Sequence, residues 1–206
     1  MLQCGLVLEG GGMKGVYTAG VLDFFLDQKL EFSSVYGVSA GACCMCSFIA
    51  KQRGRARDVM MDYLYSRKYC SVRIDGELYL DGGISDAIPL QKSVTDGNRK
   101  NVVVMTKEVG FVRKPASQLA LIRARYIRYP KVAELMAHRH TNYNEQTAYI
   151  ETLQQEGKAF VIRPKKKPQV GRVEKDAEKL RAFYEEGYRD AEEAYEALRK
   201  YLSSEY

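Results

Sequence analysis

Residues Gly37 to Gly41 read GVSAG, in which a serine stands between two glycines. This spacing is typical of a nucleophile elbow, a sharp turn from a strand to a helix that exposes the serine hydroxyl. Glycines are needed on both sides because side chains would clash in so tight a turn. The amides that begin the following helix favour the negative charge of acyl transfer. The pattern predicts Ser39 as a nucleophile; a serine that only caps a helix is the plainer alternative.

A second glycine-rich segment, GGGMKG at Gly10 to Gly15, follows a predicted strand and precedes a predicted helix. Because glycines have no side chains, the backbone amides of this segment are uncovered and can bind an oxyanion or a phosphate. The same glycines also satisfy the dinucleotide-binding pattern, which requires an acidic residue about 20 positions further on, at the end of the second strand. Glu31 precedes that strand, and the serine elbow occupies its end. We therefore favour an oxyanion hole over a nicotinamide site.

The third candidate is Asp81, which ends a predicted strand and is followed by Gly82 and Gly83. A carboxylate in this position can point into a site, although an ordinary aspartate-glycine turn gives the same pattern. An aspartate of ordinary pKa, about 3.9, is a weak base for a hydroxyl group. It must be desolvated and held against the serine to accept its proton.

Together, GGGMKG, GVSAG and DGG resemble the signature of the patatin-like phospholipase family, and the stretch LDGGISDAIP from Leu80 to Pro89 is similar to the family's sequence after its aspartate. The resemblance implies Ser39 as nucleophile and Asp81 as base, in hydrolysis of acyl esters of phospholipid, lysophospholipid or related lipid, with no metal and no cofactor. It implies oxyanion donors at Gly10, Gly11, Gly12 and Ala40. It also implies motif or structural roles for Lys14, Gly15, Gly37, Gly41, Gly82 and Gly83.

The elements that must position these residues alternate as strand, tight turn and helix, twice over, which indicates α/β architecture with parallel pairing. The family resemblance implies a doubly wound, mainly parallel sheet in three α/β/α layers. We expect strands at 3–9, 34–37, 101–106 and 159–163, a hairpin of 72–74 and 77–80 around Asp75-Gly76, and helices at 14–26, 41–50 and 54–65, within 118–155 (broken at Pro130) and within 173–202.

We expect one patatin-like domain over residues 1–170, with residues 171–206 forming an amphipathic tail packed on it. Only 42 residues (81 − 39) separate the serine from the aspartate. The family generally has a longer stretch there, so the chain is either a shortened form or lacks a segment near residues 66–72.

The amino-acid composition limits the binding partners, metal sites and location that we expect for this protein. The net charge of +6 favours anionic surfaces, and we expect peripheral contact with an anionic membrane and no nucleic acid. The five cysteines are an odd number, and we expect reduced thiols in the core and no metal site. There is no apolar run of 18 or more residues, so we expect no membrane span, no cleaved signal and a cytoplasmic location.

Two further functions remain open. A Ser-Asp-His esterase would use His138 or His140, which follow Ser39 and Asp81 in the required chain order. A binding-only protein would keep the motifs and use basic residues to contact a membrane surface. Those residues are Arg123, Arg125, Arg128 and Lys131.

Overall fold

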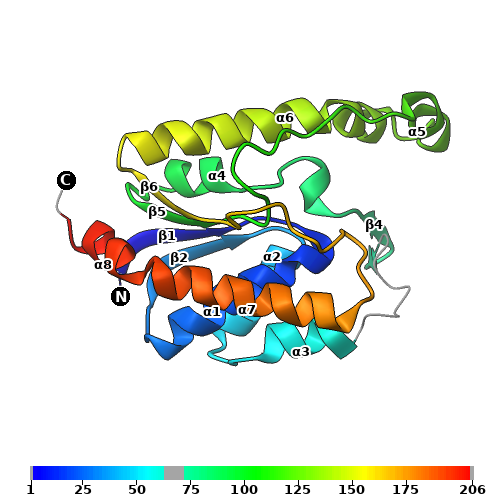
Figure 1. Ribbon diagram of the computed structural model, residues 1–206. Helices are drawn as coiled ribbons and strands as arrows, with labels where there is room; N and C mark the ends of the chain where they lie inside the picture. Colours follow the sequence, from blue (N-terminus) through cyan, green and yellow to red (C-terminus); the bar gives the residue numbers. More distant parts are fainter. Residues whose placement is uncertain (1, 63–71, 205–206) are drawn as a thin grey trace.

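The computed structural model describes residues 2–62 and 72–204. A four-stranded parallel sheet in the order β2-β1-β5-β6 forms its centre, with helices on both faces (Figure 1). Every residue of β5 is buried, as its continuous apolar sequence predicts. The predicted α/β class is confirmed. The strands are β1 (Leu2–Leu8), β2 (Phe32–Gly37), β5 (Asn101–Val104) and β6 (Ala159–Ile162).

One face of the sheet is covered by helices from both ends of the chain. Of these, α1 is buried along nearly its whole length because α7 packs along it (Figure 1). Apolar side chains of both helices share one core cluster with β1 and β2. The helices on this face are α1 (Gly15–Asp27), α2 (Ala40–Ile49), α3 (Arg55–Asp62), α7 (Ala177–Glu193) and α8 (Tyr195–Ser203).

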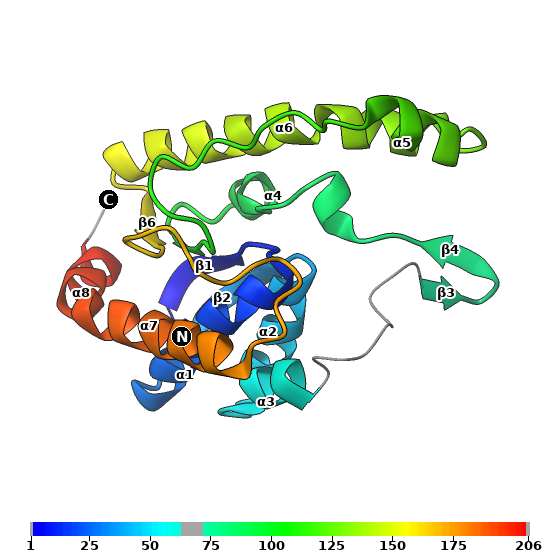
Figure 2. The same ribbon diagram turned by 45° about the vertical axis from the view of Figure 1, so that its right-hand side comes forward.

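The opposite face carries α4 (Leu90–Thr95) and α6 (Pro130–Gln155), and α5 (Leu119–Arg125) extends the α6 layer beyond the sheet (Figures 1 and 2). A second core cluster lies here and includes Tyr143, Ile150 and Leu153 of α6. Pro130 stands in the first turn of α6, where its missing amide costs no helical hydrogen bond. The sheet therefore separates two cores, as expected for three layers.

The predicted hairpin is confirmed: β3 (Val72–Ile74) pairs with β4 (Glu77–Tyr79) in antiparallel fashion. Its two turn residues both have positive φ, 49° at Asp75 and 86° at Gly76, as a type I′ turn requires. In both views the hairpin lies at the same end of the molecule as α5 (Figures 1 and 2). Short 3₁₀ helices, η1 (Gly12–Lys14) and η2 (Gly82–Ile84), follow β1 and β4.

Two expectations need correction. No helix was expected at α4, which spans only six residues and is too short for its periodicity to be recognised. The cysteines were expected in the core, yet Cys43 and Cys46 are exposed because they lie on the outer side of α2; only Cys4 and Cys44 are buried. Cys70, residues 63–65 of the predicted third helix and most of the stretch 66–72 lie outside the described residues.

The C-terminal helices pack on the sheet domain through α1, while the boundary at residue 170 stays a prediction. Across residues 2–62 and 72–204, no helix combines the length and the apolar character that a membrane crossing requires.

Candidate active site

Ser39 stands between the end of β2 and the start of α2, with φ 54° and ψ −123°. A non-glycine residue in this region costs about 1–3 kcal/mol, and such strain is common where a side chain must be presented for chemistry. The flanking glycines allow the turn. A Cβ atom on Gly37 would lie 2.8 Å from the Ala42 amide nitrogen, and one on Gly41 would lie 2.6 Å from the Leu8 carbonyl oxygen.

Asp81 meets this serine directly. The Ser39 hydroxyl donates to Asp81 Oδ2 at 2.6 Å, although the two residues lie on different elements. The other carboxylate oxygen, Oδ1, accepts from the Gly83 amide at 2.7 Å, which fixes the carboxylate across its own turn. Arg139 of α6 in turn donates from Nε to the Gly83 carbonyl at 2.8 Å. The carboxylate is thus oriented by the turn, and the turn is held by α6.

The glycine loop lies against the serine elbow. A Cβ atom on Gly10 would lie 3.3 Å from Ser39 Cβ and 2.9 Å from the Val38 carbonyl oxygen, so only glycine fits there. The Gly10 amide donates to the Ala87 carbonyl at 3.0 Å, which occupies it and speaks against Gly10 as an oxyanion donor. Within the described chain, no acceptor is found for the amides of Gly11, Gly12 or Ala40. Gly11, Gly12 and Ala40 therefore stay the predicted oxyanion donors.

Glu9, which the sequence reasoning did not select, is completely buried behind this loop. It accepts hydrogen bonds from the amide and hydroxyl of Thr106 and, at 2.9 Å, from the hydroxyl of Tyr143. Burial raises the pKa of the Tyr143 hydroxyl, and the Glu9 charge raises it further. Glu9 therefore ties β1 to the end of β5 and to α6. Its only sequence signal is a charge at the end of an apolar strand.

Several basic side chains lie on the same side of the molecule as Ser39, Asp81 and the glycine loop. The pKa of Arg139 is lowered to about 10, mainly by burial and in part by the charges of Arg113 and Arg172, whereas Asp81 opposes the shift. Burial likewise lowers the pKa of Lys107 to about 8. For Lys14, which also has a lowered pKa, burial is again the main cause. The sequence reasoning named only Lys14 of these cations, because the others lie far away along the chain.

Neither histidine reaches the serine or the aspartate. The Nδ1 atoms of His138 and His140 lie 3.0 Å from the carbonyl oxygens of Glu134 and Ala137, within α6 itself. No histidine among the described residues contacts Ser39 or Asp81, so the structure does not assemble a histidine triad. Glu31 is exposed just before β2, at the strand end away from the glycine loop, where it forms an ion pair with Lys51. It is not placed to hold a ribose at that loop.

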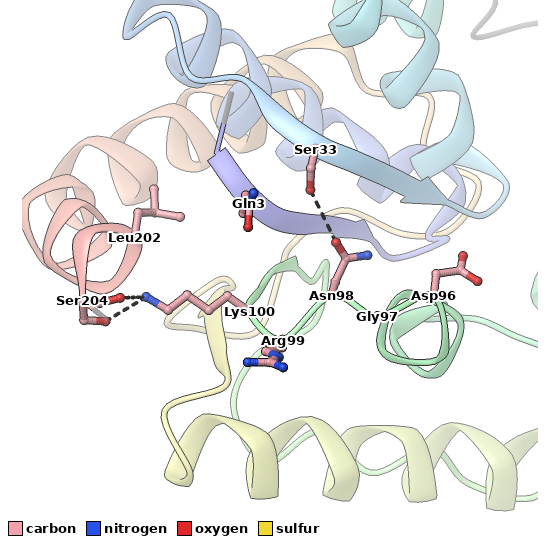
Figure 3. Close-up of a pocket in the computed structure, with 9 residues that line it drawn as sticks. All are labelled: Gln3, Ser33, Asp96, Gly97, Asn98, Arg99, Lys100, Leu202 and Ser204. Atoms are coloured by element: carbon pink, nitrogen blue, oxygen red, sulfur yellow. Dashed lines mark hydrogen bonds between the residues drawn. The ribbon is translucent and has the colours of Figure 1, made fainter. Parts of the chain in front are cut away.

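A pocket of about 570 Å³ lies at the other end of the sheet, where the strands begin (Figure 3). Several of its polar groups already have partners. The Lys100 ammonium group donates to the carbonyl of Tyr201 and to the hydroxyl of Ser204, which ties α8 to β5. Asp96 accepts from Tyr36 and Lys92. We assign this pocket no chemistry. Over the residues that the structure describes, no cluster of three or more metal-ligating side chains occurs.

Two family models match separate parts of the chain. Residues 6–73 match the model of the family described as Patatin-like phospholipase. Residues 129–203 match a Domain of unknown function (DUF6363). A curated relative, the Uncharacterized protein YjjU of Escherichia coli (strain K12), is 46% identical over 65 residues, which are 31% of this chain and 18% of the relative. The matched stretch therefore spans less than a fifth of that relative's length. The first match supports the patatin-like phospholipase family, a family of hydrolases.

Proposed function

We propose that the chain is a patatin-like serine acyl hydrolase that cleaves acyl esters of phospholipid, lysophospholipid or related lipid. The observation that carries the proposal is the 2.6 Å hydrogen bond from the Ser39 hydroxyl to Asp81 Oδ2. A nucleophile and its base must lie within this distance for proton transfer to accompany attack. The family match over residues 6–73 supports the same chemistry.

In the proposed reaction, Ser39 Oγ attacks the ester carbonyl carbon and passes its proton to Asp81. The oxyanion that forms is stabilised by the amides of Gly11, Gly12 and Ala40, and preorganised amides of this kind contribute a large part of the rate. Asp81 then donates the proton to the leaving alcohol. In the second half Asp81 accepts a proton from water, which attacks the acyl-enzyme carbonyl carbon. Asp81 then returns that proton to Ser39 Oγ as the acyl–oxygen bond breaks and the fatty acid leaves.

The Asp81 carboxylate is an effective base only when little water surrounds it. Asp81 is exposed in the free protein, so the substrate's acyl chain has to exclude solvent. Apolar side chains are available beside it: Leu80 is 43% exposed, and Tyr79 and Ile74 of the hairpin are about half exposed. We propose that these side chains contact the acyl chain.

A binding-only protein is the second candidate, and one observation favours it. Leu121 of α5 and Ile127 just after α5 are 65% and 78% exposed, next to the basic side chains of Arg123, Arg125 and Arg128. An exposed apolar and basic segment is typical of peripheral attachment to an anionic membrane. This surface is compatible with an enzyme as well, so the two functions are separated by catalysis and not by membrane binding.

The test is fatty-acid release from a short-chain lysophospholipid. Wild-type protein is expected to turn over, and Ser39→Ala is expected to reduce the rate to background. The double variant His138→Ala/His140→Ala serves as the matched control and should keep the wild-type rate. Loss of activity in the histidine variant would favour the triad, and no turnover by folded wild-type protein would favour the binding-only function.

A further inference from the structure

Three arginines from separate parts of the chain lie around the candidate active site, and two of them act electrostatically on the third. Arg139 comes from α6 and donates to the Gly83 carbonyl, two residues after Asp81. Arg172 comes from the segment before α7 and lies over the glycine loop: its carbonyl accepts from the Met13 amide at 3.1 Å, and its Cγ would be 2.9 Å from a Cβ atom on Gly12. Both parts of the catalytic machinery thus have an arginine beside them.

Arg113, from the segment after β5, completes the group. Its guanidinium carbon lies 4.2 Å from the centroid of the Tyr143 ring, whose hydroxyl donates to the buried Glu9. Its Nε atom is buried and has no hydrogen-bond partner among the described residues. A buried guanidinium nitrogen without an acceptor is costly, and such a group calls for an explanation.

The hydrogen bonds of the nearby acids go to groups other than these arginines. Glu9 accepts three hydrogen bonds from Thr106 and Tyr143, and Asp81 accepts from Ser39 and Gly83. Among the residues that the structure describes, no ion pair involves any of the three arginines. The arginines also repel one another, since Arg113 and Arg172 both lower the pKa of Arg139. Lys14 and Lys107 add further positive charge next to the loop.

We propose that Arg113, Arg139 and Arg172 bind the phosphate group of the lipid ester, so that the substrate class is an anionic phospholipid or lysophospholipid. This inference rests on the proposed function. Guanidinium groups match phosphate geometry with paired N–H donors, and several of them around one anion give selectivity for it. An ester whose acyl carbon reaches Ser39 places its head group within the same basic surroundings.

Two of the three arginines lie in the part of the chain that matches a domain of unknown function. These are Arg139 and Arg172, which both fall within residues 129–203. The residues matched by the patatin-like model, 6–73, supply Ser39 and the glycine loop. Residues 6–73 would therefore provide the nucleophile, and residues 129–203 would provide two of the three arginines that select the substrate.

The experiment compares two esters that differ only in the phosphate: a short-chain lysophosphatidic acid and the monoacylglycerol with the same acyl chain. Arg172→Gln is expected to lower the ratio of their kcat/KM values about tenfold, the usual size of one charge-assisted hydrogen bond. Arg172 is exposed, and glutamine keeps most of its apolar stem. Arg181→Gln, which removes the same charge from the exposed side of α7, is the matched control and should leave the ratio as it is. An unchanged ratio in Arg172→Gln would overturn the inference.

Two further measurements separate the remaining possibilities. Inorganic phosphate that inhibits monoacylglycerol hydrolysis, without any preference of the wild type for the phosphate ester, would assign the arginines to free phosphate and overturn the head-group assignment. Direct binding of lysophosphatidic acid to Ser39→Ala, compared with Ser39→Ala/Arg172→Gln, does not depend on catalysis. Weaker binding by the double variant supports the arginine site even if no ester is hydrolysed, whereas equal binding refutes it.

Discussion

Ser39 adopts a backbone conformation, φ 54° and ψ −123°, that glycine reaches more easily than any other residue. If the strain is retained for presenting the hydroxyl, its removal should stabilise the fold while abolishing chemistry. We predict that Ser39→Gly is more stable than Ser39→Ala by about 1 kcal/mol in urea unfolding. Both variants lose the hydroxyl, so the comparison isolates the backbone. Equal stability would mean that the elbow is not strained.

Lys107 gives a pH-dependent prediction. Its pKa is lowered from an ordinary value of 10.5 to about 8, mainly by burial; the charges of Lys14 and Arg113 act in the same direction, and those of Glu9 and Glu108 oppose it. Between these two pH values the unfolded chain binds more protons than the folded protein, so stability rises with pH. The unfolding free energy of wild type minus that of Lys107→Gln should therefore be flat below about pH 8 and increase toward pH 10.5. A difference that falls over this range would contradict the assignment.

At this scale the sequence identified the two residues that the structure joins by a hydrogen bond, while their catalytic roles stay a prediction. Ser39 and Asp81 could be identified from short local patterns. Each pattern forms a turn that depends on glycines, so it can be recognised without knowledge of the tertiary structure. Glu9, Arg139 and Arg172 were missed because their importance comes from contacts across the fold, which spacing along the chain does not reveal. Gly10 was expected as an oxyanion donor, yet its amide serves the Ala87 carbonyl, a contact that only the tertiary structure could show.

Among the elements, the contact of α1 with α7 depends on two glycines. A Cβ atom on Gly187 would lie 2.2 Å from the Tyr17 carbonyl oxygen, and one on Gly20 would lie 2.0 Å from the Tyr184 carbonyl oxygen. The helices therefore approach until their backbones almost touch. Tyr184 also donates to the buried Asp23 of α1 at 2.7 Å, which fixes the register of the pair.

Gly187→Ala should accordingly destabilise the protein by about 1–3 kcal/mol in thermal or urea unfolding, because the helices must separate. The sign of the change in unfolding free energy is informative. In an exposed helix alanine is favoured over glycine by about 1 kcal/mol, so a destabilising effect has to come from the close packing. Gly171→Ala is the control: the nearest atom to a Cβ there is 3.9 Å away, so a small effect is expected. Stabilisation by Gly187→Ala would show that the helices are not so closely packed.

The strands, the hairpin and the longer helices could be predicted because their patterns extend over several residues or include a strong turn signal. The Asp75-Gly76 pair identified the hairpin, and the Pro130 break separated α5 from α6. By contrast, α4 has six residues and gives no periodic signal. The outward side of α2, which exposes Cys43 and Cys46, could not be inferred from a helix made almost entirely of small and apolar residues.

For the whole molecule, the topology explains why distant residues meet. In an open parallel sheet, ligands bind at the carboxyl ends of the strands, where the chain order reverses. The glycine loop follows β1, the serine elbow follows β2, and Thr106 lies just after β5, all at this end. Asp81 reaches the same place from the hairpin, only 42 residues beyond the serine. The Asp81 carboxylate therefore reaches the Ser39 hydroxyl despite the short separation along the chain.

The central claim is that Asp81 activates Ser39, and the rate of labelling by a fluorophosphonate probe, followed by intact mass and peptide mapping, tests it most directly. We predict one adduct on Ser39 in the wild type, none in Ser39→Ala, and labelling at least about 100-fold slower in Asp81→Asn, the scale expected for loss of a general base. Asparagine keeps an oxygen for the Gly83 amide, so the turn is preserved. Equally fast labelling of Ser39 in Asp81→Asn, or no labelling of folded wild-type protein, would contradict the account.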